Sequence, residues 1–319
     1  SGTSSAPKAV VHPYRTLCAS ARHGADDMGY GQDDMVMCAP SFTHAFGVMI
    51  TLSAIAAGSA SPMMPVYTPP ALAEILRYTK STILCCGPAH VMAGKAASLW
   101  DAEYTESLKY IFMGGAMCTE EVMNTIEDSC PNGKAMQVWG MTETLMPILL
   151  PLDASFDDRK AFLGTPPIGH EVRSVDEDGS ILEANEEGEL EIRGPFLLSN
   201  YYFNNKANES SFTEDGWFKT GDMVMIDEND RVNMTGRVKD VINRGGIKIN
   251  PLDIEVLLDD RPDVIQSAVV PMPDELLGER ACLFLVMAPE QTLTLDDVRD
   301  YLESKGIMKT KWPERLEII

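Results

Sequence analysis

The sequence predicts an α/β fold in three parts: a parallel-sheet α/β subdomain, an antiparallel β-barrel-like subdomain, and a small, mobile α+β C-terminal domain. Three observations predict it. Apolar runs of strand length alternate with helical stretches over residues 1–150, which is typical of a parallel sheet. Closely spaced strands separated by D-G and E-G turns dominate residues 151–236, which is typical of antiparallel pairing. Compact α/β patterning returns over residues 237–319.

The elements of the first part follow from their patterns. Short apolar runs bounded by Gly or Pro predict buried strands, and amphipathic stretches that begin at Pro or Thr predict helices. Because ligands bind at the carboxyl ends of parallel strands, the residues "GGA" and "GMTE", which directly follow such strands, are expected to carry chemistry. The predicted strands are 34–40, 82–88 and 108–116, and the predicted helices are 69–81 and 119–130, the latter N-capped by Thr119.

The later elements follow from turn signals. Residues 170–195 predict three strands joined by a D-G and an E-G turn, and residues 224–237 predict a further hairpin. A domain boundary is expected at Gly236 to Asp240, so that 1–236 would be a truncated large domain and 237–319 an incomplete small one. The small domain is predicted to contain helices near 251–260 and at 295–306, and strands at 267–273 and 281–289.

Composition indicates a soluble globular protein and argues against several functions. Hydrophobic residues make up 45% of the 319 residues and charged residues 23%, which is ordinary for a folded domain. No apolar run has the length of a membrane span, and a net charge of −22 argues against a nucleic-acid surface. The seven cysteines show no C-x-x-C spacing and the five histidines no metal-site spacing, so reduced thiols in a cytoplasmic protein are expected.

The chain opens with "SGTSSAPK", which has the composition of a phosphate-binding loop. Backbone N–H groups and hydroxyls of such segments donate to phosphate oxygens, and Lys8 supplies a positive charge. It is not a Walker loop, because Pro7 and Ala9 stand where that pattern has Gly and Ser or Thr. From these residues alone, a disordered Ser-rich terminus remains the alternative.

Two carboxylates are candidates for binding roles. Glu143 in "QVWGMTET" (137–144) follows a Gly turn at a strand end and could hold Mg²⁺, with a helix N-cap and acidic first turn as an equal alternative. Asp222 in "GWFKTGD" (216–222) offers two acceptor oxygens that suit the hydroxyls of a ribose. Taken alone, a plain G-D turn is the stronger interpretation of Asp222.

Two further segments carry weaker signals. In residues 235–255, Arg237 is a cation with several donors, and Gly245 and Gly246 allow close backbone approach; the alternative is a surface loop. His44 lies between aromatic residues in "APSFTHAFG", where a histidine is more often a satisfied core residue than a functional one.

Taken together and in order, six segments closely resemble the AMP-forming acyl-CoA synthetase (adenylate-forming ligase) superfamily. The opening resembles its Ser/Thr/Gly phosphate loop ending in P-K, and "PSFTHAFG" its P-x-x-H-x-x-G segment. "MGGA" resembles its Gly-Gly-Ala loop, "WGMTE" its aromatic-G-x-T-E motif, "WFKTGD" its T-G-D, and "GRVKDVINRGGIKINPLDIE" its hinge motif. Six motifs in family order are very specific, so the phosphate-loop interpretation replaces the disordered tail.

The resemblance implies roles residue by residue. The implied cofactor-binding residues are Thr3, Ser4 and Lys8 for the β- and γ-phosphates, Gly114, Gly115, Ala116, Trp139 and Gly140 around the adenine, Asp222 and Arg237 for the ribose, and Gly245 and Gly246 near the thiol-acceptor path. The implied catalytic residues are Thr142 near the α-phosphate, Glu143 as the Mg²⁺ ligand, His44 at the acyl pocket, and Lys239 at the hinge; Phe46, Met141 and Met146 would line or approach that pocket.

The implied function is ATP-dependent activation of a carboxylic acid to an acyl-adenylate, followed by thioester formation with coenzyme A. The implied cofactors are ATP, Mg²⁺ and coenzyme A, and the partner is a small carboxylic acid, suspected to be apolar or aromatic because no Asp is placed to hold an α-ammonium group. Two alternatives stay open: an adenylation enzyme that loads a carrier-protein thiol, and a non-catalytic nucleotide-binding relative.

Three positions depart from the family pattern. Ser5 and Ala9 stand where the phosphate loop usually has Gly, and Asp253 replaces a Glu of the hinge motif. The resemblance also implies that the chain is an internal fragment, which begins at the phosphate loop and ends before the adenylation lysine. The fragment itself is therefore expected to be impaired as an enzyme.

Overall fold

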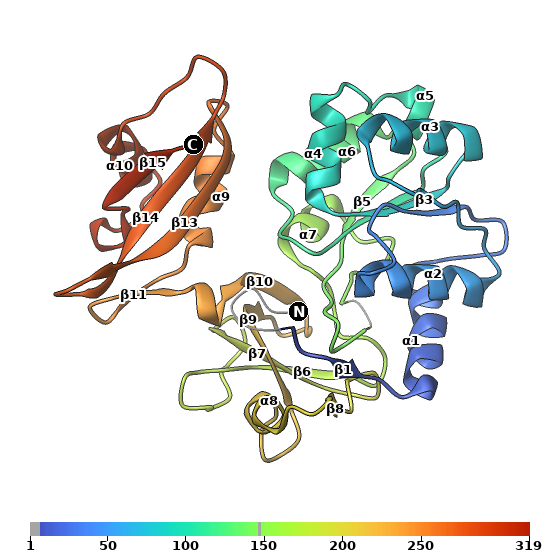
Figure 1. Cartoon of the computed structure of the whole chain (residues 1–319), viewed down its shortest axis with the longest axis horizontal. Helices are drawn as coiled ribbons and strands as arrows, with labels where there is room; N and C mark the ends of the chain where they lie inside the picture. The colour runs from blue at the N-terminus through green and yellow to red at the C-terminus, as the bar shows by residue number, and fades with distance from the viewer. Residues whose placement is uncertain (1–6, 146–147) are drawn as a thin grey trace. The chain divides into compact units, whose positions relative to one another are not determined.

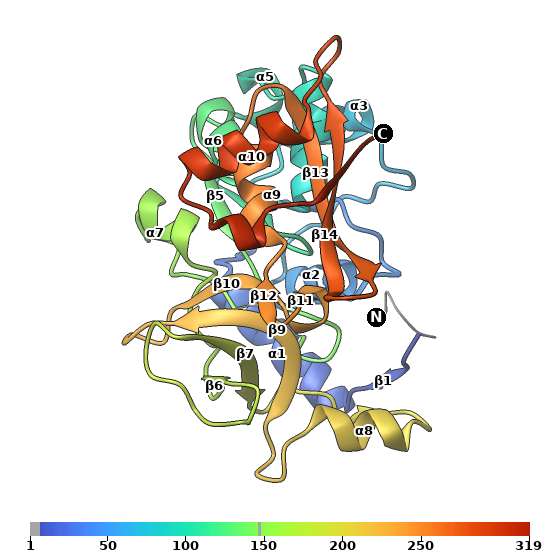
Figure 2. The ribbon, with the colours of Figure 1, turned by 90° about the vertical axis from the view of Figure 1, so that its left-hand side faces the viewer.

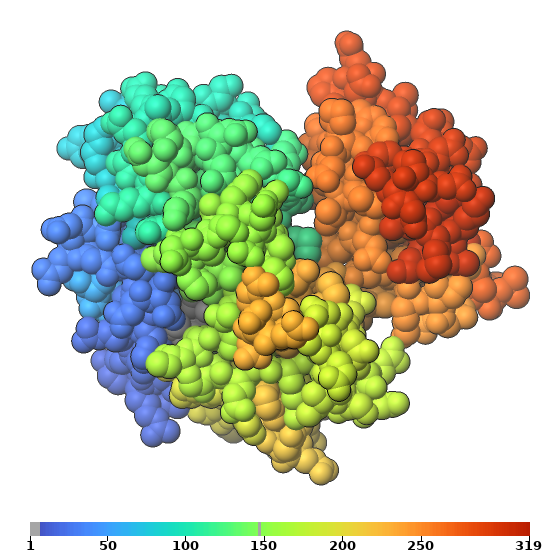
Figure 3. Space-filling view, turned by 180° about the vertical axis from the view of Figure 1, so that it is seen from behind, coloured from blue at the N-terminus to red at the C-terminus, as the bar shows by residue number. Residues whose placement is uncertain are grey.

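The structure, a computed structural model, describes residues 7–145 and 148–319, which form two compact units. In the space-filling view the residues toward the C-terminus, coloured dark orange to red, lie together (Figure 3). The domain boundary expected near Gly236 stays a prediction. The first unit comprises Ser1–Arg173, Glu191–Thr220 and Ile226–Asn233, and the second comprises Ser174–Leu190, Gly221–Met225 and Met234–Ile319.

A parallel sheet forms the centre of the first unit (Figure 1). Its four strands are β2 (Val36–Cys38), β3 (Ile83–Cys86), β4 (Tyr110–Met113) and β5 (Lys134–Gln137), in that spatial order. All neighbouring strands pair in parallel, and nearly every residue in them is buried. The parallel sheet predicted from the sequence is confirmed, and its burial on both faces explains why its strands read as continuous apolar runs.

Helices cover both faces of this sheet. One core joins α3 (Pro69–Thr79), α4 (Pro88–Ala96) and α6 (Glu120–Ser129) to strand residues such as Leu84 and Ile111. The other core joins α1 (Tyr14–Asp27) and α2 (Ala45–Ala57) to Ile83 and Phe112. Because successive strand side chains point to opposite faces, adjacent residues of one strand enter different cores. The same unit contains the short helices α5 (Ala102–Thr105) and α7 (Phe156–Ala161).

Helix ends follow the predicted capping chemistry. The hydroxyl of Thr68 accepts a hydrogen bond from Ala71 N at the beginning of α3, where Pro69 occupies the first helical position. The Thr119 hydroxyl accepts from Val122 N at the beginning of α6, as predicted. Each cap satisfies a backbone donor that the first helical turn leaves without a partner.

An antiparallel sheet follows in the chain, in the order β10-β9-β7-β6. Its strands are β6 (Glu171–Val175), β7 (Glu187–Arg193), β9 (Phe218–Ile226) and β10 (Val232–Arg237), and α8 (Asn205–Ser211) precedes β9. The strand predicted between the D-G and E-G turns is wrong. Only an isolated bridge pairs Ile181 with Val175, and Ile181 is 65% exposed, so this segment has no core face to hold it as a strand.

A second pairing joins residues that are distant in sequence. Strand β1 (Val10–Val11) pairs antiparallel with β8 (Asn200–Tyr201), with Val10 opposite Tyr201. Two flanking backbone bonds extend the pairing, from Ser199 N to Val11 O and from Tyr202 N to Ala9 O. Figure 1 shows β1 and β8 side by side. The pairing brings the residues after Lys8 next to Tyr201.

The C-terminal part of the second unit is a sheet covered by two helices. The strand order is β12-β11-β14-β13, with β15 parallel to β14. Helices α9 and α10 share one apolar core with this sheet, through residues such as Ile254, Leu302 and Leu283 (Figure 2). The elements are η1 (Val238–Asp240), β11 (Ile242–Arg244), β12 (Ile247–Ile249), α9 (Leu252–Asp259), β13 (Val264–Asp274), β14 (Gly278–Met287), α10 (Leu295–Ser304), η2 (Lys309–Lys311) and β15 (Arg315–Ile318).

All seven cysteines are free thiols, and Cys18 in α1 is the one that is exposed. Burial raises the pKa of the Cys38, Cys118 and Cys130 thiols to about 12. These thiols are therefore neutral at neutral pH, and the thiolate is the reactive form of cysteine. Among the described residues, none of the helices has the length and apolar character needed to cross a bilayer.

We expect iodoacetamide at about pH 8 to modify a single cysteine rapidly in the folded chain, because burial and a raised pKa protect the other thiols. After unfolding in guanidinium, all seven should react. Mass spectrometry of timed samples measures both phases. The Cys18→Ser variant is the control and should lack the rapid phase; rapid modification that persisted in this variant would show that a buried thiol opens to solvent.

Candidate functional site

Three of the predicted segments gather at the carboxyl edge of the parallel sheet. Gly114 to Ala116 follow β4, Trp139 and Gly140 follow β5, and His44 follows β2 as the N-cap of α2. Because the strands are parallel, their carboxyl ends lie at one edge, which is where α/β sheets place ligands. The structure therefore brings these residues to one edge of one sheet.

Positions 114 and 115, which follow β4, favour glycine for two different physical reasons. Gly114 is buried, and a Cβ there would lie 2.9 Å from the carbonyl oxygen of Val138 and 2.8 Å from its Cγ2. Gly115 has φ +86°, a left-handed conformation that favours glycine, and among the described residues other than its chain neighbours no atom lies within 4 Å of where its Cβ would be. Ala116 and Gly115 are exposed, so this loop keeps open space beside the sheet edge.

His44 is not the core residue that the alternative interpretation supposed. It is exposed, and its Nδ1 accepts a hydrogen bond from Phe46 N at 3.2 Å, which caps α2. Phe46 is half-buried and lies near the carboxyl end of the sheet, 3.8 Å from where a Cβ on Gly114 would be. The P-x-x-H-x-x-G segment thus brings an aromatic side chain close to the glycine loop.

The turn after Trp139 presents the hydroxyl and carboxylate of the aromatic-G-x-T-E motif. Trp139 is buried and its backbone pairs in both directions with Ile148. Gly140 is exposed, and the following turn closes with Thr144 N donating to Met141 O. The described residues 141–145 form a turn and not a helix, so the helix N-cap interpretation of Glu143 is wrong.

Glu143 lies in a buried polar cluster. Its side chain is 1% exposed, and its Oε1 accepts a hydrogen bond from the hydroxyl of Tyr201 at 2.9 Å. The Lys8 ammonium lies over the Tyr201 ring, 4.3 Å from its centroid. The preceding residue, Thr142, accepts a 2.7 Å hydrogen bond at its carbonyl oxygen from His12 Nε2. One carboxylate and one cation of the predicted phosphate site are therefore joined through a single phenol.

Electrostatics keeps the two aromatic members of this cluster neutral. Burial, together with the neighbouring Glu143 carboxylate, raises the pKa of the Tyr201 hydroxyl, so that it remains a donor. Burial lowers the pKa of His12, and the hydrogen bond to Thr142 opposes this shift only in part. At neutral pH, Tyr201 and His12 therefore add no charge to the cluster.

The cluster fits a magnesium ion that is shared with a phosphate ligand. Across the residues that the structure describes, no group of three or more His, Cys, Asp or Glu side chains could hold a metal by itself. Mg²⁺ is usually bound by one or two carboxylates and by the substrate's phosphates, rather than by a protein cage. A single buried carboxylate beside a cation suits that mode. Thr3, Ser4 and Met146 lie outside the described residues.

The second unit holds the other predicted residues. Asp222 is buried inside strand β9, so the plain-turn interpretation is wrong, and its Oδ1 accepts from Arg237 Nε at 3.1 Å on the neighbouring strand. Lys239 is exposed in η1. Gly245 and Gly246, with φ of +58° and +94°, form the two-residue turn between β11 and β12, where both positions require left-handed backbone.

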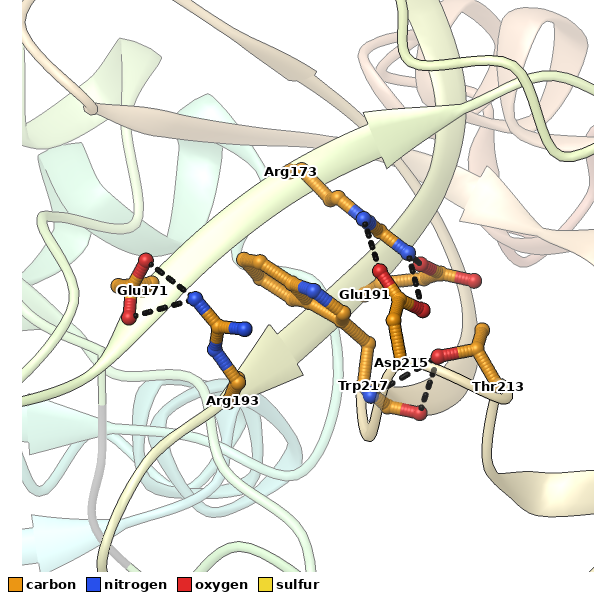
Figure 4. A network of polar contacts seen from close by, with 7 residues as sticks. All are labelled: Glu171, Arg173, Glu191, Arg193, Thr213, Asp215 and Trp217. Carbon is orange, nitrogen blue, oxygen red and sulfur yellow. Dashed lines mark hydrogen bonds and ion pairs between the residues drawn. The ribbon is translucent and has the colours of Figure 1, made fainter.

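Sequence reasoning missed a network around Trp217, the residue before β9. The guanidinium carbons of Arg173 and Arg193 lie 4.3 and 4.6 Å from its ring centroid, one on either side of the indole (Figure 4). Arg173 also pairs at 2.6 Å with Glu191, which is almost fully buried. Charged residues at every second position of "EVR" and "ELEIR" were the available signal. Stacking of this kind fixes the beginning of β9.

We expect Trp217→Ala to lower the free energy of unfolding by about 3–5 kcal/mol, because it removes a large buried side chain and leaves two guanidinium groups without a stacking partner. Trp217→Phe keeps an aromatic face and should lose much less. Urea unfolding followed by circular dichroism measures both. Arg77→Ala, which removes an exposed ion pair with Glu74, is the control and should cost far less than Trp217→Ala. Equal losses of stability in all three variants would contradict a special role for the stacking of Trp217 between Arg173 and Arg193.

Comparison with known proteins agrees with this geometry. The family model described as "AMP-binding enzyme" matches residues 1–202. The chain is 30% identical over 316 residues to 4-coumarate–CoA ligase 1 of Solanum tuberosum, covering 96% of this chain and 58% of that protein. It is 33% identical over 334 residues to 2-hydroxy-7-methoxy-5-methyl-1-naphthoate–CoA ligase of Streptomyces carzinostaticus, covering 99% of this chain and 57% of that protein.

Solved structures share the fold. ATP-bound MatB from Rhodopseudomonas palustris matches with a TM-score of 0.93 at 24% identity, over 100% of this chain and 63% of that one. o-Succinylbenzoate CoA synthetase from Bacillus subtilis, in complex with an acyl-adenylate intermediate, matches with a TM-score of 0.88 at 23% identity, over 100% of this chain and 64% of that one. The chain therefore spans less than two thirds of the length of these relatives. Motifs, fold and family model agree, and the chain belongs to the AMP-binding enzyme family.

Proposed function

We propose that this chain serves the ATP-dependent activation of a small carboxylic acid to an acyl-adenylate, followed by transfer of the acyl group to the thiol of coenzyme A. The observation that carries the proposal is the cluster of Lys8, Tyr201 and Glu143, in which the buried Glu143 comes from the turn after Trp139. A cation and a carboxylate held together at a sheet edge suit a magnesium–triphosphate ligand. The relatives named above are ligases that join acids to coenzyme A.

In the first step, a carboxylate oxygen of the acid attacks the α-phosphorus of ATP, and pyrophosphate leaves. Lys8 would contact the β- and γ-phosphates, and Thr142 would lie near the α-phosphate. Mg²⁺, when bound by Glu143 and the phosphates, would act as a Lewis acid and offset their negative charge. The protein's part is to hold cationic groups where negative charge develops.

The nucleoside would be held by residues of different chemical character. Trp139 and the loop of Gly114, Gly115 and Ala116 would border the adenine, where the open space beside Gly115 leaves room for a flat ring. Asp222 would accept from the ribose hydroxyls, with Arg237 holding its carboxylate in place. An ionised carboxylate has acceptors for both hydroxyls.

The acid is proposed to be apolar or aromatic. His44, Phe46 and Met141 would line or approach its pocket, and a medium-chain fatty-acid–CoA ligase of Escherichia coli (strain K12) is among the relatives, at 28% identity. In the second step, the thiol sulfur attacks the acyl carbon and AMP leaves. Gly245 and Gly246 are proposed to lie along the path of the thiol, and Lys239 is proposed to be the hinge for the domain movement between the steps.

Ligand binding tests the proposal without requiring turnover. We expect 4-coumaroyl-sulfamoyladenosine, which resembles the acyl-adenylate, to bind the chain at least about 100-fold more tightly than AMP, because it engages the nucleotide and acid sites together. Isothermal titration calorimetry measures both ligands. The phenylalanyl analogue is the matched control, since its α-ammonium group has no proposed partner and should weaken binding.

Failure to bind either AMP or any acyl analogue would overturn the proposed function. Where turnover is measurable, acid-dependent AMP and pyrophosphate release should accompany it, and offering coenzyme A and a pantetheinylated carrier protein separately identifies the acceptor. Thioester formed on the carrier alone would replace coenzyme A by a carrier-protein thiol. Nucleotide binding without any acid dependence would favour a non-catalytic relative.

We expect Asp222→Asn to weaken ATP binding by roughly 10- to 100-fold, because it replaces charge-assisted hydrogen bonds to the ribose by weaker neutral ones. Calorimetric titration with ATP gives this ratio. Asp215→Asn is the control, since Asp215 pairs with Arg173 in the Trp217 network. If the unaltered chain binds 2′,3′-dideoxy-ATP as tightly as ATP, the ribose role of Asp222 is wrong.

A further inference from the structure

We propose that Tyr201 is a positioning residue of the phosphate site, which holds the Glu143 carboxylate and the Lys8 ammonium in the arrangement that a magnesium–triphosphate ligand requires. The inference rests on the proposed function, because it assigns Tyr201 to the same site. No sequence motif marked this residue. It follows from the contacts that one buried phenol makes with two groups of opposite charge.

The hydroxyl of Tyr201 fixes the orientation of Glu143. It donates to Oε1 at 2.9 Å, and both side chains are buried, at 2% and 1% exposure. A carboxylate can otherwise rotate about its last torsion, which is broad rather than staggered. A hydrogen bond to one oxygen sets the plane of the group and so the direction in which the other oxygen faces. The hydrogen bond from Tyr201 would thus orient Glu143 for metal binding, as neighbouring residues commonly do for metal-binding carboxylates.

The ring of Tyr201 holds the cation. The Lys8 ammonium lies 4.3 Å from the ring centroid, where the negative face of the aromatic ring attracts it. Lysine is a long and flexible side chain, and restricting it before the ligand arrives lowers the entropy that binding must remove. The phenol therefore acts on both groups by different parts of its structure, through its hydroxyl on Glu143 and through its ring on Lys8.

Tyr201 is itself held from three sides. Its strand, β8, pairs with β1, and a single residue, Ala9, separates β1 from Lys8. The pairing therefore fixes the backbone of Lys8 close to that of Tyr201. Asn208 accepts from Tyr201 N at 2.7 Å and donates to Tyr201 O at 3.1 Å. The Tyr201 side chain packs in a core with Leu198 and Phe218. A side chain fixed this firmly can transmit its position to the groups it contacts.

The test separates the hydroxyl from the ring. ATP affinity is measured by calorimetry with Mg²⁺ and with excess EDTA, and the ratio of the two affinities is the magnesium gain. Tyr201→Phe removes only the hydroxyl, so we expect unchanged ATP affinity in EDTA and a magnesium gain about tenfold smaller, which is the scale of one hydrogen bond to a charged group. Tyr201→Leu also removes the aromatic face and should weaken ATP binding in EDTA as well.

The matched control is Tyr202→Phe. Tyr202 is the next residue and is 61% exposed, so loss of its hydroxyl should alter neither affinity. Circular dichroism and thermal unfolding establish that each variant is folded. Should Tyr201→Leu fail to fold, the Tyr201→Phe comparison decides by itself, because that variant keeps the packed ring.

The possible failures are distinguishable. If the unaltered chain does not bind ATP, the proposed function fails. If it binds ATP with a magnesium gain that Tyr201→Phe retains in full, the proposed function stands and the positioning role is wrong. Tyr201→Phe that is less stable but keeps its magnesium gain shows a purely structural tyrosine and also overturns the inference.

Discussion

Burial of the parallel sheet on both faces is the constraint on which the first unit depends. Helices α1 and α2 cover one face, and α3, α4 and α6 cover the other, so the strands are mostly apolar and the polar residues of β5, Lys134 and Gln137, stand at its two ends. Because all four strands run in the same direction, the loops after β2, β4 and β5 meet at one edge. The same packing that stabilises the fold therefore collects the candidate site.

Long-range antiparallel pairing supplies what the sheet edge lacks. The loops after the strands contain a carboxylate and hydroxyls but no cation, and Lys8 comes from the beginning of the chain. Pairing of β1 with β8 brings Lys8 to Tyr201, which in turn contacts Glu143. Three segments that are far apart in sequence thus form one cluster. Its carboxylate is buried, which is tolerable only because Glu143 is hydrogen-bonded, and its cation, Lys8, is half-buried against the Tyr201 ring.

In this strongly acidic chain, arginine side chains pair with carboxylates, and some of them also stack on an aromatic ring. The chain has 48 Asp and Glu residues against 26 Lys and Arg, so carboxylates outnumber cations, yet buried carboxylates still need donors. Arg173 meets this need for the buried Glu191, whereas Arg193 pairs with the exposed Glu171, and both guanidinium groups also stack on Trp217. Arg237 pairs with the buried Asp222. Arginines thus pair with the buried carboxylates of Glu191 and Asp222, whereas many of the other ion pairs are exposed.

Much of the fold was predictable because its signals are local. Apolar runs such as "ILCC" predicted buried strands, and Thr119 predicted the beginning of α6, since capping needs only residues that are three positions apart. The strand expected around Ile181 was wrong, because alternation alone does not supply a core for a strand to pack on.

The sequence by itself determined the family motifs, the parallel α/β part, and the residue types that suit phosphate and ribose. Only the tertiary structure decided that Asp222 lies within a strand, that His44 is exposed, and that Trp217 is held between two arginines. Tyr201 is the clearest case, because both of its partners are distant in sequence. Glu143 is 58 residues away, and Lys8 comes close only because β1 pairs with β8. Motifs record chemistry that is local in sequence, whereas a hydrogen bond across the fold exists only once distant strands have paired.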